Sequence, residues 1–215
     1  MRQAWWSLGL VLCLAGCMEP AQERLRDYTQ DGVNQFERGN YNGARDCFLA
    51  AQTITPEDAV LYYNLGQCYD RMGDVVNAER FYNESLQRSP NLADCQHALN
   101  SLLVRVGRRP EAVRHVQDWL AREPQRAAAY AEDGWLYYEA GDLPRAQARL
   151  QQALGLDPHE QRALIELARV YEVLKRPEQA AALYERVLDR DPKQAEVVKR
   201  LKQLRSQGAG APLPD

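Results

Sequence analysis

Residues 59–92 read AVLYYNLGQCYDRMGDVVNAERFYNESLQRSPNL, and the spacing of certain residues in this stretch recurs along the chain. Its proline, Pro90, has counterparts at intervals of 34 residues, and so does its alanine, Ala78. The two series are Pro56, Pro90, Pro124, Pro158 and Pro192, and Ala44, Ala78, Ala112, Ala146 and Ala180. A fixed period of this length is the signature of an array of stacked supersecondary units. The period therefore predicts the fold, and it favours a binding surface over a catalytic pocket.

Each unit of the period contains two helix-length segments separated by a turn. In residues 59–92 the fourth, seventh and eleventh places hold Tyr62, Leu65 and Tyr69, a spacing that puts them on one face of a helix. The fifteenth place suits the end of this helix, because it repeatedly holds glycine, which adopts left-handed backbone freely. The residues at this place are Gly39, Gly73, Gly107, Gly141 and, in the last unit, Lys175. The pattern predicts an all-α chain of helical hairpins.

Two further places predict how the helices of one hairpin meet. The eighth place holds small residues, which we expect to face the alanines of the twentieth place. A large residue at the twenty-fourth place would then fill the space beside that contact. The eighth-place residues are Gly32, Gly66, Gly134 and Ala168, and the twenty-fourth-place residues are Phe48, Tyr82, Leu150 and Tyr184.

The pattern as a whole resembles the tetratricopeptide repeat, a helix–turn–helix unit of 34 residues. The unit at residues 59–92 carries it most fully, with Tyr62, Leu65, Gly66, Tyr69, Ala78, Tyr82 and Pro90. The resemblance implies an all-α, right-handed superhelical solenoid whose first helices line a concave groove. The five expected repeats are Leu25–Asp58, Ala59–Leu92, Ala93–Arg126, Ala127–Glu160 and Gln161–Gln194.

The third expected repeat, residues 93–126, departs most from the pattern. Gln96 stands at the place of the aromatic residue, Asn100 at that of the glycine, Val116 at that of the large residue and Trp119 at that of a small one. Two interpretations stay open at this stage: a locally altered helix pair, or ordinary sequence drift.

The residues after the array are expected to close it. Residues 195–207 predict one more helix, whose apolar stripe would cover the end of the array, as terminal repeats require. The stripe is Val197, Val198, Leu201 and Leu204, and the opposite face carries Lys199, Arg200, Lys202 and Arg205. This basic face is either a solvated surface or a contact for an acidic partner or anionic lipid. Residues 208–215 are small and proline-containing, which is typical of a disordered tail.

The amino-terminal residues 1–16 predict an export signal. Arg2 precedes the apolar run Ala4–Gly16, which at about 1.5 Å per residue is too short for the ~30 Å core of a bilayer. The run ends in Leu14-Ala15-Gly16-Cys17, which resembles the lipobox of bacterial lipoproteins. The resemblance implies that the signal is cut before Cys17, that Cys17 carries the lipid and that residues 17–24 are a short tether. An ordinary signal peptide with an incidental cysteine is the alternative.

The resemblance to a lipobox also implies a subcellular localisation. Two or more acyl chains hold a protein stably at a membrane, so the membrane would be a partner through the lipid anchor. Met18 occupies the position where an inner-membrane retention signal would place Asp. By resemblance this favours the outer membrane of the bacterial envelope, with the array facing the periplasm.

Three cysteines would remain in the mature array: Cys47, Cys68 and Cys95. We expect three small buried residues. One disulfide with one free thiol is the alternative, since export favours oxidation. Their spacing does not suit a zinc site.

Residue patterns that indicate catalysis do not stand out. The three histidines (His97, His115 and His159) lack the paired spacing of metal ligands, and the net charge of −3 gives no basic footprint for nucleic acid. We therefore expect no enzyme, cofactor, metal, nucleic acid or small-molecule substrate. An envelope enzyme with an unrecognised site is the alternative from another functional class.

A protein or peptide in the concave groove is the expected partner. In the family that the chain resembles, the second, fifth, ninth, twelfth and thirteenth places tend to face the groove, and aromatic and Arg side chains supply much of the energy of interfaces. The candidate residues at these places are Phe36, Tyr63, Gln67, Arg71, His97, Arg105, Trp135, Tyr138, Arg162 and Arg169, and Asn64 joins them because it fits one place of the carboxylate clamp of some family members. Some of the aromatic residues could instead pack between repeats.

The function that the sequence favours is a non-catalytic, membrane-anchored scaffold or assembly factor of the bacterial cell envelope. A narrower hypothesis is a pilotin-like factor for assembly of the type IV pilus secretin. That hypothesis rests on a similar plan, an outer-membrane lipoprotein with about this many repeats.

Overall fold

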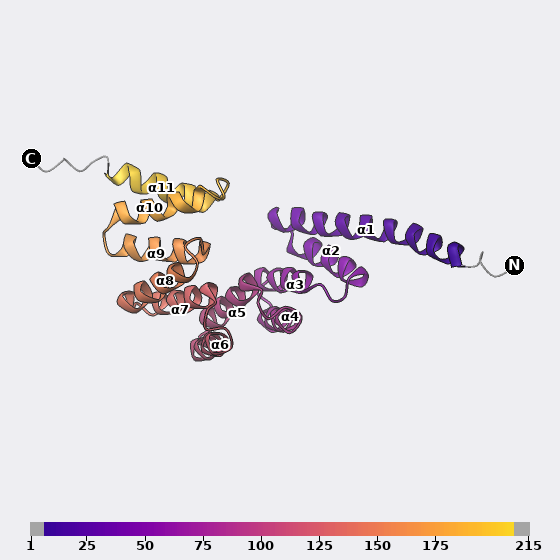
Figure 1. The fold of residues 1–215 in the computed structure, drawn as a ribbon, viewed down its shortest axis with the longest axis horizontal. Helices are drawn as coiled ribbons and strands as arrows, with labels where there is room; N and C mark the ends of the chain where they lie inside the picture. The colour runs from indigo at the N-terminus through magenta and orange to yellow at the C-terminus, as the bar shows by residue number, and fades with distance from the viewer. Residues whose placement is uncertain (1–6, 209–215) are drawn as a thin grey trace, which may run out of the picture. The chain divides into compact units, whose positions relative to one another are not determined.

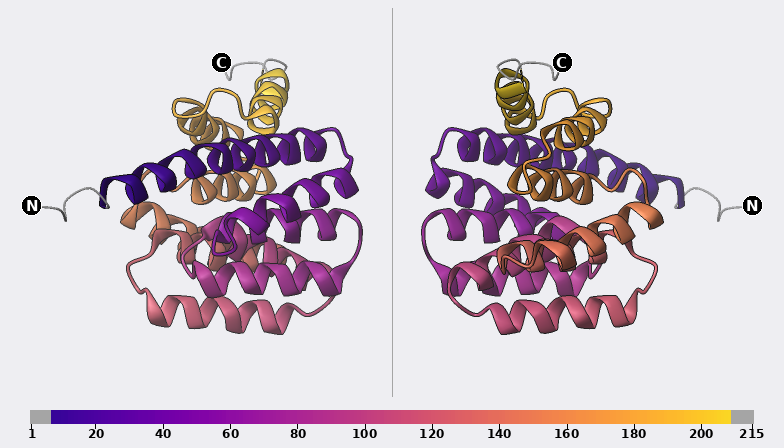
Figure 2. Two further views of the ribbon diagram at one scale, coloured as in Figure 1. Left: turned by 90° about the vertical axis from the view of Figure 1, so that its right-hand side faces the viewer. Right: turned by 90° about the vertical axis from the view of Figure 1, so that its left-hand side faces the viewer.

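The computed structural model describes the backbone of residues 7–208 and the side chains of residues 21–206. Within residues 7–208 the chain forms eleven helices and no strand (Figure 1). The helices are α1 (Ser7–Glu37), α2 (Tyr41–Ile54), α3 (Ala59–Arg71), α4 (Val75–Arg88), α5 (Ala93–Arg105), α6 (Arg109–Arg122), α7 (Ala127–Glu139), α8 (Leu143–Leu156), α9 (Gln161–Val173), α10 (Pro177–Leu188) and α11 (Ala195–Gly208). The two helices of four repeats pack as hairpins, namely α1 with α2, α3 with α4, α7 with α8 and α9 with α10, which confirms the predicted all-α solenoid of helix pairs (Figure 2).

The chain divides into two compact units between Gly107 and Arg108. The first unit contains α1–α5 and the second contains α6–α11. The division lies inside the third repeat, whose sequence departs most from the pattern.

The turns between the helices of each repeat have the predicted left-handed residue. Gly39, Gly73, Gly107 and Gly141 have φ between 76° and 80°, and Lys175 has φ 58°. The next residue is the N-cap of the second helix, and in three repeats its side chain accepts a hydrogen bond from a backbone N–H of the first turn. These caps are Asn40, Asp74 and Asp142.

The recurring prolines supply an acceptor for the following helix. The hydroxyl of Tyr62 donates to the carbonyl oxygen of Pro56 at 2.9 Å, and Tyr130 donates to Pro124 at 3.1 Å. In the third repeat the Nε2 of Gln96 donates to Pro90 at 2.9 Å. Gln96 therefore replaces the aromatic residue of the pattern and keeps its hydrogen bond.

The eighth-place glycines set how closely the two helices of a repeat approach. A Cβ atom added to Gly32 would lie 2.5 Å from the ring of Phe48, and one added to Gly66 would lie 2.5 Å from the ring of Tyr82. At Gly134 the corresponding distance to Leu150 is 2.6 Å. The nearest atoms belong to the twenty-fourth-place side chains and not, as expected from the sequence, to the twentieth-place alanines. The large side chain packs directly on the glycine backbone.

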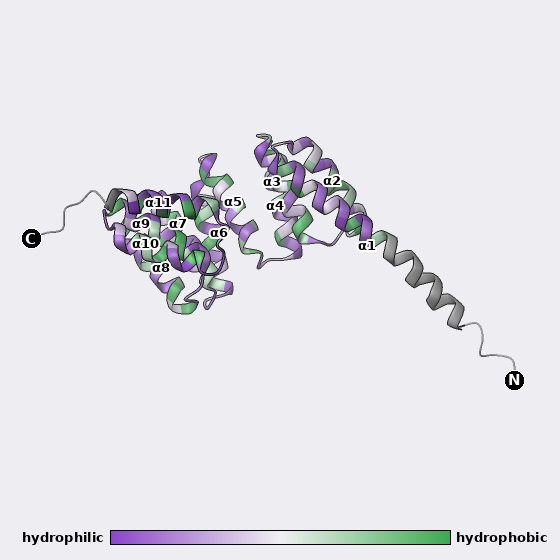
Figure 3. Cartoon of the chain, turned by 90° about the horizontal axis from the view of Figure 1, so that it is seen from above, coloured by the Kyte–Doolittle hydropathy of each residue, from purple (hydrophilic) through white to green (hydrophobic). Residues whose placement is uncertain are grey.

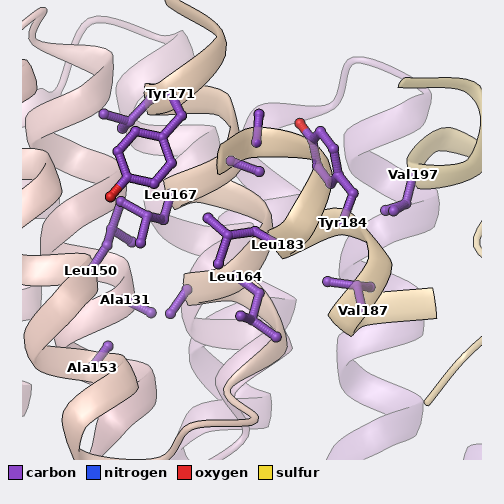
Figure 4. Packing of buried hydrophobic residues seen from close by; sticks show 14 of the residues in the cluster. Ala131, Leu150, Ala153, Leu164, Leu167, Tyr171, Leu183, Tyr184, Val187 and Val197 are labelled. Carbon is purple, nitrogen blue, oxygen red and sulfur yellow. The ribbon is translucent and has the colours of Figure 1, made fainter. Parts of the chain in front are cut away.

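Each unit buries its own hydrophobic core. Figure 3 shows that single helices carry both hydrophobic and hydrophilic residues. In the second unit, Leu150 of α8, Leu164 of α9 and Tyr184 of α10 are at most 2% exposed and belong to one cluster (Figure 4). Val197 of α11 joins the same cluster and is 3% exposed, so the last helix covers apolar surface of α10.

The basic face of α11 is largely paired within the chain. Arg200 contacts Glu172 of α9 at 3.1 Å, and Arg205 contacts Glu185 of α10 at 2.8 Å. These two arginines therefore help to fasten α11 to the array, which leaves less free charge than the sequence suggested.

At the other end, α1 is longer than the first helix of a repeat. It runs without a break from Ser7 to Glu37, so the segment expected as a tether is helical here. The side chain of Cys17 and the residues of the expected carboxy-terminal tail beyond Gly208 lie outside the described part. Among the described residues, no helix is both long enough and apolar enough to span a bilayer.

The contact between Gly66 and Tyr82 gives a test of the fold. We predict that Gly66→Ala destabilises the protein by about 1–3 kcal/mol, because the added methyl group overpacks against a ring that is 1% exposed. Gly155→Ala is the matched control, since nothing lies within 4 Å of the added Cβ on α8. That change should stabilise the helix by about 0.5–1 kcal/mol. Urea unfolding followed by circular dichroism measures both, and equal stability of the two variants would contradict this packing.

Candidate functional site

The candidate residues of the first unit lie on its first helices. Phe36 is on α1; Tyr63, Asn64, Gln67 and Arg71 are on α3; His97 and Arg105 are on α5. Helices α3 and α5 are in contact, so their candidate residues belong to neighbouring elements. Arg71 and Arg105 are exposed and the other five are half-buried.

Arg71 of α3 contacts aromatic rings of the preceding repeat. Its guanidinium carbon lies 5.8 Å from the ring centroid of Phe36 and 5.9 Å from that of Tyr41. The two rings themselves pack edge to face, with centroids 5.2 Å apart. A cation over an aromatic face is attracted to it, so this arrangement links α3 to α1 and α2.

Two other polar contacts order the face of the first unit. Arg105 of α5 forms an ion pair with Asp70 of α3. The Nε2 of Gln67 donates to the hydroxyl of Tyr63 at 2.6 Å, one helical turn apart on α3. The hydroxyl of Tyr63 therefore already has a hydrogen-bond donor within the chain.

The candidate residues of the second unit lie on α7 and α9, which are also in contact. Trp135 of α7 is 5% exposed, so it offers a partner little surface. Tyr138 of α7 is half-buried, and the guanidinium carbon of Arg169 from α9 lies 4.5 Å from its ring centroid. The expectation that some aromatic residues pack inside the array thus fits Trp135 better than Tyr138.

The arginines of α9 also meet carboxylates. Arg169 contacts Glu166 of its own helix at 2.7 Å and Glu139 of α7 at 3.8 Å. Arg162 lies 3.9 Å from Glu132 of α7, whose side chain is 1% exposed. A carboxylate removed from water needs such a partner, because an uncompensated buried charge is strongly destabilising.

One rule covers all four candidate arginines: each reaches the first helix of the preceding repeat. Arg71 reaches Phe36, Arg105 reaches Asp70, and both Arg162 and Arg169 reach α7. The residues that these arginines contact were not predicted from the sequence. They are Tyr41, Asp70, Glu132, Glu139 and, on the same helix as Arg169, Glu166. The signal was present, since Phe36 and Arg71, like Asp70 and Arg105, are one period plus one residue apart.

The cysteines have little nucleophilic character. Burial raises the pKa of the Cys68 thiol to about 12 and that of Cys95 to about 11. Burial also raises the pKa of Cys47, which is half-buried. All three are free thiols, and at neutral pH they are protonated. Within the described part of the chain, no group of three or more His, Cys, Asp or Glu residues is placed to hold a metal ion.

Comparison with known families identifies the repeats. Residues 59–92 and 137–204 match models of the tetratricopeptide repeat, and residues 35–73 match a third model, described as a TPR repeat. Together the matches cover more than half of the chain. The chain is a tetratricopeptide repeat protein. Proteins of this family are generally non-catalytic scaffolds for protein–protein interaction.

Solved structures of tetratricopeptide repeat proteins share the fold. A thermophilic protein of Thermus thermophilus, TTC0263, is 23% identical over 85% of this chain and 99% of its own, with a TM-score of 0.65. Yeast Tom70 is 19% identical, with a TM-score of 0.61, over 85% of this chain but only 39% of its own. PilF of Pseudomonas aeruginosa is 17% identical over 88% of this chain and 86% of its own, with a TM-score of 0.55. No protein among those with curated functions matches the sequence.

The contacts of Arg169 predict its role in the tetratricopeptide repeat array. Arg169→Ala should destabilise the protein by about 1–3 kcal/mol, because Glu166, which is 6% exposed, loses a charged partner and Tyr138 loses its cation–π contact. Arg190→Ala is the control, since Arg190 is exposed and has no ion pair among the described residues. Its effect should stay within about 0.5 kcal/mol. If urea unfolding finds the two variants equally stable, Arg169 does not link the repeats.

Proposed function

We propose that this tetratricopeptide repeat protein is a non-catalytic scaffold, anchored by lipid in the bacterial cell envelope, that holds a protein partner on the face of its first helices. The observation that carries the proposal is the order of the chain: residues 14–17, which resemble a lipobox, shortly precede the repeats. An acylated Cys17 would hold the array beside the membrane.

The binding face is supported by the kinds of residue that the first helices bring together. In the first unit, α1, α3 and α5 carry Phe36, Tyr63, Arg71, His97 and Arg105, and aromatic and Arg side chains dominate the energetics of protein interfaces. Because the arginines already contact neighbouring repeats, a partner would meet side chains held in position. Such preorganisation lowers the ordering cost of binding.

The outer membrane is the proposed location, with the array in the periplasm, and Met18 after the lipid-bearing cysteine supports it. A pilotin-like role in secretin assembly is a narrower version of the same proposal. Its support is the similar architecture alone, a lipoprotein with about this many repeats. Normal pilus assembly after deletion of the gene for this protein, in a strain that carries a secretin, would count against it.

The anchor predicts a difference between two cysteines of the same segment. We expect Cys17→Ala to lose metabolically incorporated fatty acid and to leave the outer-membrane fraction, because the thiol is the attachment point. Cys13→Ala should keep both, since Cys13 would be removed with the signal. Lipid label or unchanged outer-membrane fractionation of the Cys17→Ala protein would contradict the anchor.

The face predicts a difference between two exposed or half-exposed positions of one repeat. We expect Tyr63→Ala, on α3, to reduce capture of a co-purifying envelope protein about tenfold, because it truncates an aromatic anchor. Val76→Ala, on α4, should not change capture although Val76 is 78% exposed. Circular dichroism should show that both variants keep their helices. Equal capture by the Tyr63→Ala and wild-type proteins would move the binding site away from this face.

A further inference from the structure

A cavity of about 420 Å³ lies at the carboxy-terminal end of the second unit, between the α9–α10 turn and α11. Its volume falls in the range of small-ligand sites, which is about 300–1,000 Å³. The lining residues are Glu172, Lys175, Pro177, Arg200, Gln203 and Leu204. None of them is among the candidate residues predicted from the sequence.

The backbone of Lys175 is unusual for a lysine. Its φ is 58°, whereas the same place in the other four repeats holds glycine with φ between 76° and 80°. Left-handed backbone is unfavourable for a residue with a Cβ atom, because that atom approaches the following carbonyl oxygen. Strained residues cluster at functional sites, so a lysine where glycine would be relaxed suggests a use for its ammonium group.

The cavity has an excess of positive charge. Lys175 makes no ion pair among the described residues, while Arg200 donates from Nη1 to Glu172 at 3.1 Å and from Nε to Glu196 at 3.2 Å. The second carboxylate oxygen of Glu172 accepts from the hydroxyl of Tyr184 at 2.5 Å. Glu172 is therefore engaged on both oxygens. Arg200 also interacts with the hydroxyl of Tyr184, so Lys175 is the cation of the cavity that no carboxylate of the described residues neutralises.

The other lining residues indicate which chemical groups of a ligand would fit the cavity. Pro177 and Leu204 are apolar, and the side chain of Gln203 can donate a further hydrogen bond. A carboxylate suits the two cations, because charge-assisted hydrogen bonds from Arg and Lys to carboxylates are short and strong. An aliphatic neighbour of that carboxylate would suit the apolar walls.

We propose that this cavity binds an acidic side chain of a protein partner, with the carboxylate between Lys175 and Arg200 and an adjacent apolar residue against Pro177 and Leu204. The inference rests on the proposed scaffold function, because it names the chemistry of one contact with the partner. The site is specific to the last repeat, since only that repeat has a cation at the turn and is followed by α11.

The test begins with a random dodecapeptide library selected on the purified full-length protein. The enriched peptides should carry Asp or Glu beside Leu, Val or Pro. Their affinities are then measured by fluorescence anisotropy at about 0.1 M salt, where weak surface attraction is screened beyond ~10 Å. Lys175→Gly should weaken binding at least about tenfold, the loss expected for one charge-assisted hydrogen bond.

The same substitution should raise the unfolding midpoint by about 2–4 °C, because it restores the residue that relaxes the turn. Replacing the acidic residue of the peptide by its amide should weaken binding to the wild-type protein more than binding to Lys175→Gly, in which only Arg200 remains to attract the carboxylate. Lys202→Gln is the matched control: it removes a charge from exposed Lys202 of α11, which does not line the cavity. Its affinity for the peptides should equal that of the wild type.

Three results would overturn the proposal: a selection without acidic preference, equal losses for Lys175→Gly and Lys202→Gln, or equal affinity of Lys175→Gly and wild type. Vesicles of phosphatidylglycerol and phosphatidylcholine distinguish a lipid phosphate from a carboxylate. If Lys175→Gly weakens vesicle binding but not peptide binding, the cavity takes a lipid headgroup instead. These binding data do not depend on the lipid anchor, so failure here is separable from failure of the membrane assignment.

Discussion

The close approach of a glycine backbone and a large side chain, found in three of the helical hairpins, is the constraint on which the array depends. Gly32 with Phe48, Gly66 with Tyr82 and Gly134 with Leu150 repeat one contact at one period. The absence of a Cβ atom lets the ring lie against the first helix, and close packing of this kind makes even one added methyl group costly. Hairpins of equal thickness can then stack, and their stability becomes a sum of local contacts between neighbours.

Once the hairpins have a fixed thickness, side chains of one repeat can reach the first helix of the preceding repeat. Arg71 and Arg105 reach residues 35 positions earlier in the chain, whereas Arg162 and Arg169 reach carboxylates 30 positions earlier. The arginines on this face are already paired with groups of the chain. We therefore expect the affinity for a partner to come more from contacts with aromatic side chains than from unpaired charges. The cavity beside α11 differs from this face. Lys175 makes no ion pair among the described residues, and part of the cavity wall comes from the last helix, α11.

The sequence predicted features that depend on one or two turns of chain. Left-handed backbone at the fifteenth place follows from glycine itself, and it held even where Lys175 replaces glycine, because the neighbouring turn is the same. The acceptors Asp70 and Glu132 were missed, because pairing between repeats depends on side-chain reach across a helix interface. The hydrogen bond of Gln96 was missed for a related reason: the acceptor is a backbone carbonyl that the sequence does not mark. Partner binding at the candidate residues stays a prediction.

Site-specific photocrosslinking in cells tests the central claim, that the first helices form the binding face, most directly. A photoreactive phenylalanine analogue replaces Tyr63 on α3 in one strain and the exposed Val76 on α4 in another. The account predicts a discrete crosslinked protein from position 63 and none from position 76. The same crosslink from both positions, or one from position 76 alone, would contradict it.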